Sequence, residues 1–205
     1  MMTDTFKEEI QTADVSIDIE KVYGPNGKSV VDLITRMQKI NWYSAIGKQR
    51  SQIEAERAIN EWRQGLNLGG YPVNRITKSY LPVLLNEVVL ETIPMWTRLG
   101  QIYNEITEKA EECGRQAILL ATIDSVSENM FHDTFDQAFR EFEEFGESVV
   151  KVVSSTTIYA MVLACAWETI ADIEGWERNH LLPFVEVFEQ GHWSLGLVDD
   201  QFYVL

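Results

Sequence analysis

Cysteine is scarce in this sequence of 205 residues, in which only Cys113 and Cys165 occur. Two cysteines cannot build the disulfide network that stabilises small secreted domains, and their separation matches no zinc-binding pattern. The first ten residues, MMTDTFKEEI, lack the basic and apolar regions of a secretory signal peptide. The sequence therefore excludes a disulfide framework and predicts a cytoplasmic protein.

Two common catalytic and nucleotide-binding motifs are also missing. The chain has no Gly-x-x-x-x-Gly-Lys phosphate loop and no Gly-x-Ser-x-Gly nucleophile elbow. Cys165 falls in an apolar stretch, where cysteine usually packs as an inert thiol, and no histidine is close in sequence to Cys113. These absences disfavour P-loop nucleotide-binding proteins and serine hydrolases.

Basic residues are few in the second half of the chain. Residues 1–100 contain 12 basic and 12 acidic side chains, whereas residues 101–205 contain 5 and 20, so the net charge of −15 arises from the second half. Nucleic acids and anionic membranes are bound through lysine and arginine. The sequence therefore argues against nucleic acids and anionic membranes as partners. It favours a protein partner, which could be basic.

A long apolar run is present, at residues 149–173, but it is too short and too polar for a membrane span. It carries no charge between Lys151 and Glu168, and its apolar residues surround the helical wheel. A spanning helix needs about 20 apolar residues, and this run is diluted by Ser154, Ser155, Thr156 and Thr157. We predict a buried central helix whose hydroxyls bond to carbonyls one turn earlier.

Most other segments show helical periodicity, and glycine and proline separate them. Ser51 followed by Glu54 has the form of a capping box, which predicts a helix start at that point. Pro82 and Pro94 predict helix breaks between residues 75 and 113. We expect helices over residues 6–23, 29–46, 51–62, 75–113 in pieces, 116–146 and 176–190, with a loop at 66–74.

Phenylalanines form a stripe on the segment 116–146. They follow steps of four, four, three and three, which places them along one side of a helix: Phe131, Phe135, Phe139, Phe142 and Phe145. We expect this stripe to pack against the central helix. The alternative is an aromatic groove for a ligand or a partner helix.

The last residues, 192–205, have the character of β-strands. Trp193, Leu195 and Leu197 alternate with other residues, and Asp199-Asp200 could form a two-residue turn. We predict a small hairpin. An isolated hairpin is marginally stable, so it must dock on the bundle or pair with another chain, and the second possibility would give a homodimer.

Candidate metal ligands occur in two places. Asp124, Glu128, His132 and Asp136 are spaced by four residues, so adjacent members share one face of a helix. Arg140 continues the row and could pair with Asp136, as on an ordinary exposed face. Glu177 and His180 form one Glu-x-x-His motif, of which helical di-iron proteins carry two copies. Either place could contribute to a site for Fe, Mn or Zn.

The sequence predicts one all-α domain over residues 1–205, with seven to nine helices around the central helix and a small C-terminal hairpin. The leading functional hypothesis is a non-catalytic cytoplasmic interaction protein whose acidic half binds a partner. The second is a metal-dependent helical enzyme that uses ligands among His132, Asp136, Glu128, Glu177 and His180. The third is a small-ligand carrier with an aromatic pocket between helices, which requires a cavity of at least about 300 Å³.

Overall fold

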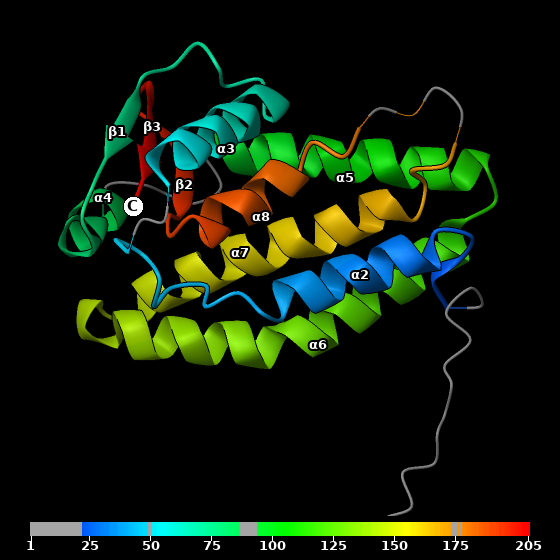
Figure 1. The fold of residues 1–205 in the computed structure, drawn as a ribbon, viewed down its shortest axis with the longest axis horizontal. Helices are drawn as coiled ribbons and strands as arrows, with labels where there is room; N and C mark the ends of the chain where they lie inside the picture. Colours follow the sequence, from blue (N-terminus) through cyan, green and yellow to red (C-terminus); the bar gives the residue numbers. More distant parts are fainter. Residues whose placement is uncertain (1–21, 49–50, 87–93, 174–175, 177) are drawn as a thin grey trace, which may run out of the picture.

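The computed structural model of the protein describes residues 22–48, 51–86, 94–173, 176 and 178–205. This part of the chain forms seven α-helices and a small sheet, which confirms the predicted helical domain with a C-terminal β part (Figure 1). The expected helix near Phe6 lies outside the described residues. The helices are α2 (Gly27–Met37), α3 (Gln52–Gly65), α4 (Leu81–Asn86), α5 (Pro94–Glu112), α6 (Gln116–Phe142), α7 (Glu147–Glu168) and α8 (Leu182–Glu189).

Helix α7 is the buried centre of the fold. It runs through the middle of the molecule, with α6 on one side and α8 on the other (Figure 1). The predicted back-bonding of its hydroxyls is confirmed, because Ser154, Thr156 and Thr157 each donate to the carbonyl four residues earlier, at 2.8 to 2.9 Å. The prediction that this run is too short and too polar for a membrane span differs from the structure, because α7 is the one described helix long and apolar enough to cross a membrane. Of its most apolar window, 78% is buried inside the fold.

Helices α6 and α7 form a hairpin whose packing differs from the prediction. The turn consists of the 3₁₀ helix η3 (Glu143–Phe145) and Gly146. The residues that α6 buries follow steps of three and four: Leu119, Thr122, Val126, Met130, Thr134, Ala138 and Phe142. Phe131 and Phe139 instead remain 48% and 49% exposed, so the prediction that the phenylalanine stripe packs on the central helix is wrong for these two. Phe142 belongs to both stripes and is buried, whereas Phe131 and Phe139 lie outside the stripe that α6 buries.

Helix α2 ends at Met37, nine residues before the predicted end. Ile40, Trp42 and Tyr43 lie beyond this end, and all three are buried. Turns over 38–47 bring both rings onto Phe188, with centroid separations of 4.7 and 6.0 Å. The Tyr43 hydroxyl then donates to Thr157 Oγ1 at 2.8 Å, which ties this segment to α7.

Helices α3 and α8 pack together above α7. The predicted start of α3 at Ser51 is confirmed, with the Glu54 amide donating to Ser51 Oγ at 3.4 Å, which is one of the two bonds of a capping box. The ring of Trp62 in α3 packs against that of Phe184 in α8, with centroids 5.0 Å apart. The Trp62 indole N–H donates to Ser194 Oγ at 3.1 Å. Helix α8 begins only at Leu182, so Pro183 lies in its first turn, where proline is tolerated.

The C-terminal hairpin is confirmed and joins a strand that was predicted as loop. Strands β2 (Ser194–Val198) and β3 (Gln201–Val204) are antiparallel, and Asp199-Asp200 form the turn with φ of 44° and 60°. Strand β1 (Val73–Arg75) pairs in parallel with β3, giving the order β1-β3-β2. The sheet lies at one end of the molecule (Figure 1), and β2 contacts α5. The hairpin therefore docks on its own chain.

Candidate functional site

The row of candidate metal ligands lies on the outer face of α6. Asp124, Glu128, His132 and Asp136 are all exposed. Within the residues that the structure describes, no group of three or more His, Cys, Asp or Glu side chains could hold a metal ion. Nor is there an ion pair between Asp136 and Arg140 in these parts of the chain. The row is therefore a set of solvated side chains, spread along the helix.

The Glu-x-x-His motif is only half described, since Glu177 lies outside the described residues. His180 packs edge-on against Trp167 of α7, with ring centroids 5.4 Å apart. It also lines a hollow of about 300 Å³ with Glu61, Gln64, Gly65, Arg178, Asn179 and Pro183. The structure brings no ligand of the α6 row into this hollow, and the metal hypothesis stays a prediction.

A second hollow lies at the α6–α7 turn, and its walls are acidic. Its volume is about 620 Å³, and it is lined by Phe139, Glu143, Glu144, Glu147 and Val150. The three glutamates are exposed, whereas Val150 is buried. Lys151 hydrogen-bonds to Glu147 and lowers the pKa of that carboxyl. The hollow thus combines an apolar floor with carboxylates, two of which have no cationic partner among the described residues.

Beyond the hollow, α6 presents a surface of mixed aromatic and acidic character. The exposed fraction is 48% for Phe131 and 49% for Phe139, and Phe135 lies between them, stacked on Phe131 at 5.9 Å. Residues 116–151 contain eight acidic and two basic side chains. We call the surface formed by Phe131, Phe135, Phe139, Asp136, Glu143, Glu144 and Glu147 the acidic–aromatic face.

At the C-terminal end of α6, the chain already holds one of its own lysines. Lys78, in the 3₁₀ helix η1 (Lys78–Tyr80), places Nζ 2.6 Å from Glu141 Oε2. The same ammonium lies 5.0 Å from the centroid of the Phe142 ring. A cation over an aromatic ring is attracted by the π electrons, and a neighbouring carboxylate adds to that attraction. The end of α6 therefore shows how such a surface binds a basic side chain.

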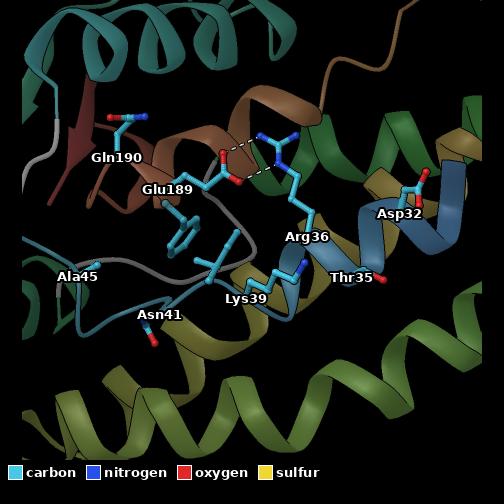
Figure 2. Close-up of a pocket in the computed structure, with 10 residues that line it drawn as sticks. Asp32, Thr35, Arg36, Lys39, Asn41, Ala45, Glu189 and Gln190 are labelled. Atoms are coloured by element: carbon cyan, nitrogen blue, oxygen red, sulfur yellow. Dashed lines mark hydrogen bonds and ion pairs between the residues drawn. The ribbon is translucent and has the colours of Figure 1, made fainter.

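A third hollow is a groove between α2 and α8. It measures about 510 Å³ and opens to solvent (Figure 2). Its lining is mostly polar: Asp32, Thr35, Arg36, Lys39, Ile40, Asn41, Ala45, Phe188, Glu189 and Gln190. Arg36 and Glu189 point toward each other from the two helices and form a bidentate pair, with Nε to Oε1 at 2.8 Å and Nη2 to Oε2 at 2.6 Å. These bonds raise the pKa of Arg36.

The far end of the groove is held in shape by a close backbone contact. Gly47 N–H donates to the Gly191 carbonyl at 3.1 Å, which fixes the turns after α2 against the end of α8. Gly191 has φ of +80°, and a Cβ there would lie 2.7 Å from the Ala45 carbonyl oxygen. Glycine is therefore required at this position. The groove is a fixed feature of the way α2 and α8 meet.

One of these candidates was indicated by the sequence only as an alternative, and the other had no sequence signal. Phe131 and Phe139 were part of the predicted phenylalanine stripe. A second stripe at helical spacing, which contains Val126, Met130 and Ala138, marks the side of α6 that is buried in the structure. The groove had no sequence signal, because Arg36 and Glu189 are 153 residues apart. This groove is not the predicted aromatic pocket, because Phe188 is the single aromatic residue that lines it.

Comparisons with known proteins add no relationship. No family model, no curated protein and no solved structure matches this chain.

Proposed function

We propose that this protein is a non-catalytic interaction protein that binds a basic, amphipathic segment of a partner protein on its acidic–aromatic face. The observation that carries the proposal is the hollow at the α6–α7 turn, where Phe139 and Val150 lie among Glu143, Glu144 and Glu147. Half-exposed phenylalanines beside carboxylates suit a ligand that is apolar on one side and cationic at its edges.

The dimensions of the face support a helical partner segment. From Phe131 to Phe142, the last residue of α6, the helix axis advances about 17 Å, at 1.5 Å per residue. A partner helix of roughly 16 residues would cover this length and extend over the α6–α7 turn, with apolar side chains over the phenylalanine rings. Lysine or arginine side chains at its edges would meet the glutamates, in the manner in which Lys78 contacts Glu141 and Phe142.

Charge argues against two other occupants of the face. Residues 1–21 of this chain carry six acidic and two basic side chains, so they would be repelled by the glutamates. A second copy of the protein would bring one acidic face against another. A basic partner from a different protein is the occupant that the charges favour.

A synthetic peptide tests the proposal directly. The probe is a fluorescent 16-residue helix of lysine and leucine at helical spacing, measured by fluorescence anisotropy against the same peptide with glutamate in place of lysine. We expect the basic peptide alone to bind. The triple variant Glu143→Gln, Glu144→Gln, Glu147→Gln should weaken binding about tenfold, since three exposed charges at about 0.5 kcal/mol each sum to about 1.5 kcal/mol. Phe139→Ala should weaken it about fivefold.

Helix α5 offers a matched control for net charge. The variant Glu108→Gln, Glu111→Gln, Glu112→Gln also removes three exposed carboxylates, one of which pairs with a lysine, as Glu147 does. Its affinity for the peptide should stay near that of the unaltered protein. Equal weakening by both triple variants would mean attraction to net charge alone, and that result would contradict the proposal. So would a failure of the unaltered protein to bind.

A further inference from the structure

Helix α2 is preceded by an asparagine that is followed by glycine, the pair in which asparagine loses its side-chain amide most readily. Asn26 is the one asparagine of the chain that a glycine follows. In this reaction the main-chain nitrogen of the next residue attacks the side-chain carbon of the asparagine. Glycine hinders the attack least because it has no Cβ. The chemistry of the chain therefore favours Asn26 over every other asparagine as a site of amide loss.

The fold holds Asn26 in a turn that does not allow this attack. The Gly27 N–H donates to the Gly24 carbonyl at 2.9 Å, and the Gly27 residue is buried. Pro25 and Asn26 occupy the centre of this turn, and φ of −93° and ψ of 13° at Asn26 are typical of a type I turn. Ring closure requires the Asn26 side chain and the Gly27 nitrogen to lie on the same side of the Cα–C bond. The turn must therefore open before Asn26 can react.

The side chain of Asn26 is held by the segment that follows α7. Its Nδ2 donates to Asp172 Oδ1 at 2.7 Å. Arg115, the residue before α6, forms a bidentate pair with the same carboxylate, with Nη2 to Oδ2 at 2.8 Å. It also donates to the Thr169 carbonyl at 2.9 Å. Figure 1 shows α2 starting at the end of the molecule where α6 begins and α7 ends. We call Asn26, Arg115 and Asp172 the Asn26 clamp, because they join these three helices.

The clamp depends on an uncharged amide at position 26. The hydrogen bond from Arg115 and, to a smaller extent, that from Asn26 lower the pKa of Asp172 to about 2, against the opposing effect of burial. Asp172 is therefore ionised at neutral pH. A carboxylate in place of the Asn26 amide would lose the donated hydrogen bond and would face a second carboxylate, and two such groups repel each other. Loss of the amide therefore breaks the contact that holds Asn26.

We propose that Asn26 is a deamidation site which the clamp protects, and that its reaction releases the start of α2 from α6 and α7. The Gly27 nitrogen forms a bond to Asn26 Cγ, the Cγ–Nδ2 bond breaks, and ammonia leaves with the proton of the Gly27 nitrogen. Water then opens the cyclic imide: its hydroxyl bonds to a carbonyl carbon, the ring C–N bond breaks, and the nitrogen regains a proton. The product is aspartate or isoaspartate. Water is in large excess over ammonia, so the clamp opens in one direction only. This site does not depend on the function proposed for the acidic–aromatic face.

Peptide mapping by mass spectrometry tests this site on the full chain during incubation at mildly alkaline pH. We expect Asp172→Ala to speed the conversion of Asn26 about fivefold in the folded protein, the factor that corresponds to the loss of one hydrogen bond. In urea, where the clamp is absent, both proteins should react faster and at equal rates. Glu105→Ala is the control, because it removes the carboxylate of the Arg98–Glu105 pair within α5. Its rate should equal that of the unaltered protein.

The variant Asn26→Asp reproduces one product and tests the release of α2. We expect it to lower the midpoint of thermal unfolding by about 2 to 4 °C. Asn104→Asp adds the same charge at an exposed position on α5 and should have little effect. In a background of Asp172→Ala, Asn26→Asp should cost less, because the opposing carboxylate is gone.

Four results would overturn the inference. These are equal conversion of Asn26 in folded and unfolded protein, an unchanged rate in Asp172→Ala, an equal gain of rate in Glu105→Ala, and equal unfolding midpoints for Asn26→Asp and Asn104→Asp.

Discussion

His192 is a buried histidine that holds the last residue of the hairpin. It is 6% exposed, and its Nδ1 lies 2.9 Å from the Leu205 carbonyl oxygen. Its Nε2 has no hydrogen-bond partner among the described residues. Burial lowers the pKa of His192 below its ordinary value of 6.5, and the positive charge of Arg75 lowers it further. The hydrogen bond to the Leu205 carbonyl and the negative charge of Glu56 raise this pKa and so oppose the shift. The folded protein therefore prefers the neutral imidazole.

This preference predicts a loss of stability in mild acid. Because the folded-state pKa lies below the unfolded value, the contribution is fully present above about pH 6.5 and is lost as the pH falls toward the folded pKa. We expect the free energy of unfolding to fall by at most about 1.4 kcal/mol per pH unit in this window. Urea denaturation at a series of pH values measures it. The variant His192→Gln should reduce the change of unfolding free energy with pH. The control His132→Gln, at an exposed position on α6, should keep this change. If the unfolding free energy of His192→Gln varied with pH as in the unaltered protein, His192 would not be its source.

At the scale of an element, the β2–β3 hairpin has a turn that its residues tolerate poorly. Asp199 and Asp200 both adopt positive φ, the conformation of the central residues in a type I′ turn. Non-glycine residues in this region are strained by about 1 to 2 kcal/mol, although aspartate tolerates it better than most. The turn nevertheless forms because the strands on either side are buried and paired.

Relief of this strain should stabilise the protein. We expect Asp200→Gly to raise the free energy of unfolding by about 0.5 to 1 kcal/mol, because glycine adopts φ of +60° without steric cost. Asp200→Ala removes the same charge but keeps a Cβ, so it should not stabilise the protein. Thermal and urea denaturation of both variants provide the comparison. An equal gain from alanine would show that charge, and not backbone conformation, is responsible.

At the scale of the whole molecule, a net charge of −15 accompanies exposed aromatic rings. Repulsion between like-charged copies opposes the contact of one acidic–aromatic face with another. As the pH falls, carboxylates take up protons and this repulsion weakens, while the apolar rings remain. Charge on this surface therefore has two consequences, attraction of a basic partner and protection from self-association.

Light scattering after size-exclusion chromatography should reveal this balance. We expect the average mass to increase as the pH is lowered from about 7 to about 5, near the upper end of carboxylate titration. The variant Phe131→Ser, Phe139→Ser should show less association at the same pH, because it removes the exposed rings and retains all charges. Leu120→Ser removes an apolar side chain that is 50% exposed elsewhere on α6 and serves as the control. Association that is unaffected by loss of both rings would contradict this account.

Signals carried by neighbouring residues were read correctly from the sequence. The uncharged run between Lys151 and Glu168 predicted the buried central helix, Ser51 and Glu54 predicted the start of α3, and Asp199-Asp200 predicted the turn of the hairpin. Each of these features depends on contacts within about four residues or on the hydrophobic character of one segment. Such contacts are present in the sequence itself.

Contacts between distant segments were decided only by the tertiary structure. Pairing of β1 with β3 joins Val73 to Phe202, and the groove depends on Arg36 meeting Glu189. On α6, the phenylalanine stripe and the stripe containing Met130 and Ala138 both have helical spacing, so periodicity alone could not select the buried one. Packing against α7 buried the stripe that contains Met130 and Ala138. The sequence determined the central helix, the helical class and the acidic charge, whereas packing determined which rings face solvent and which distant charges share a groove.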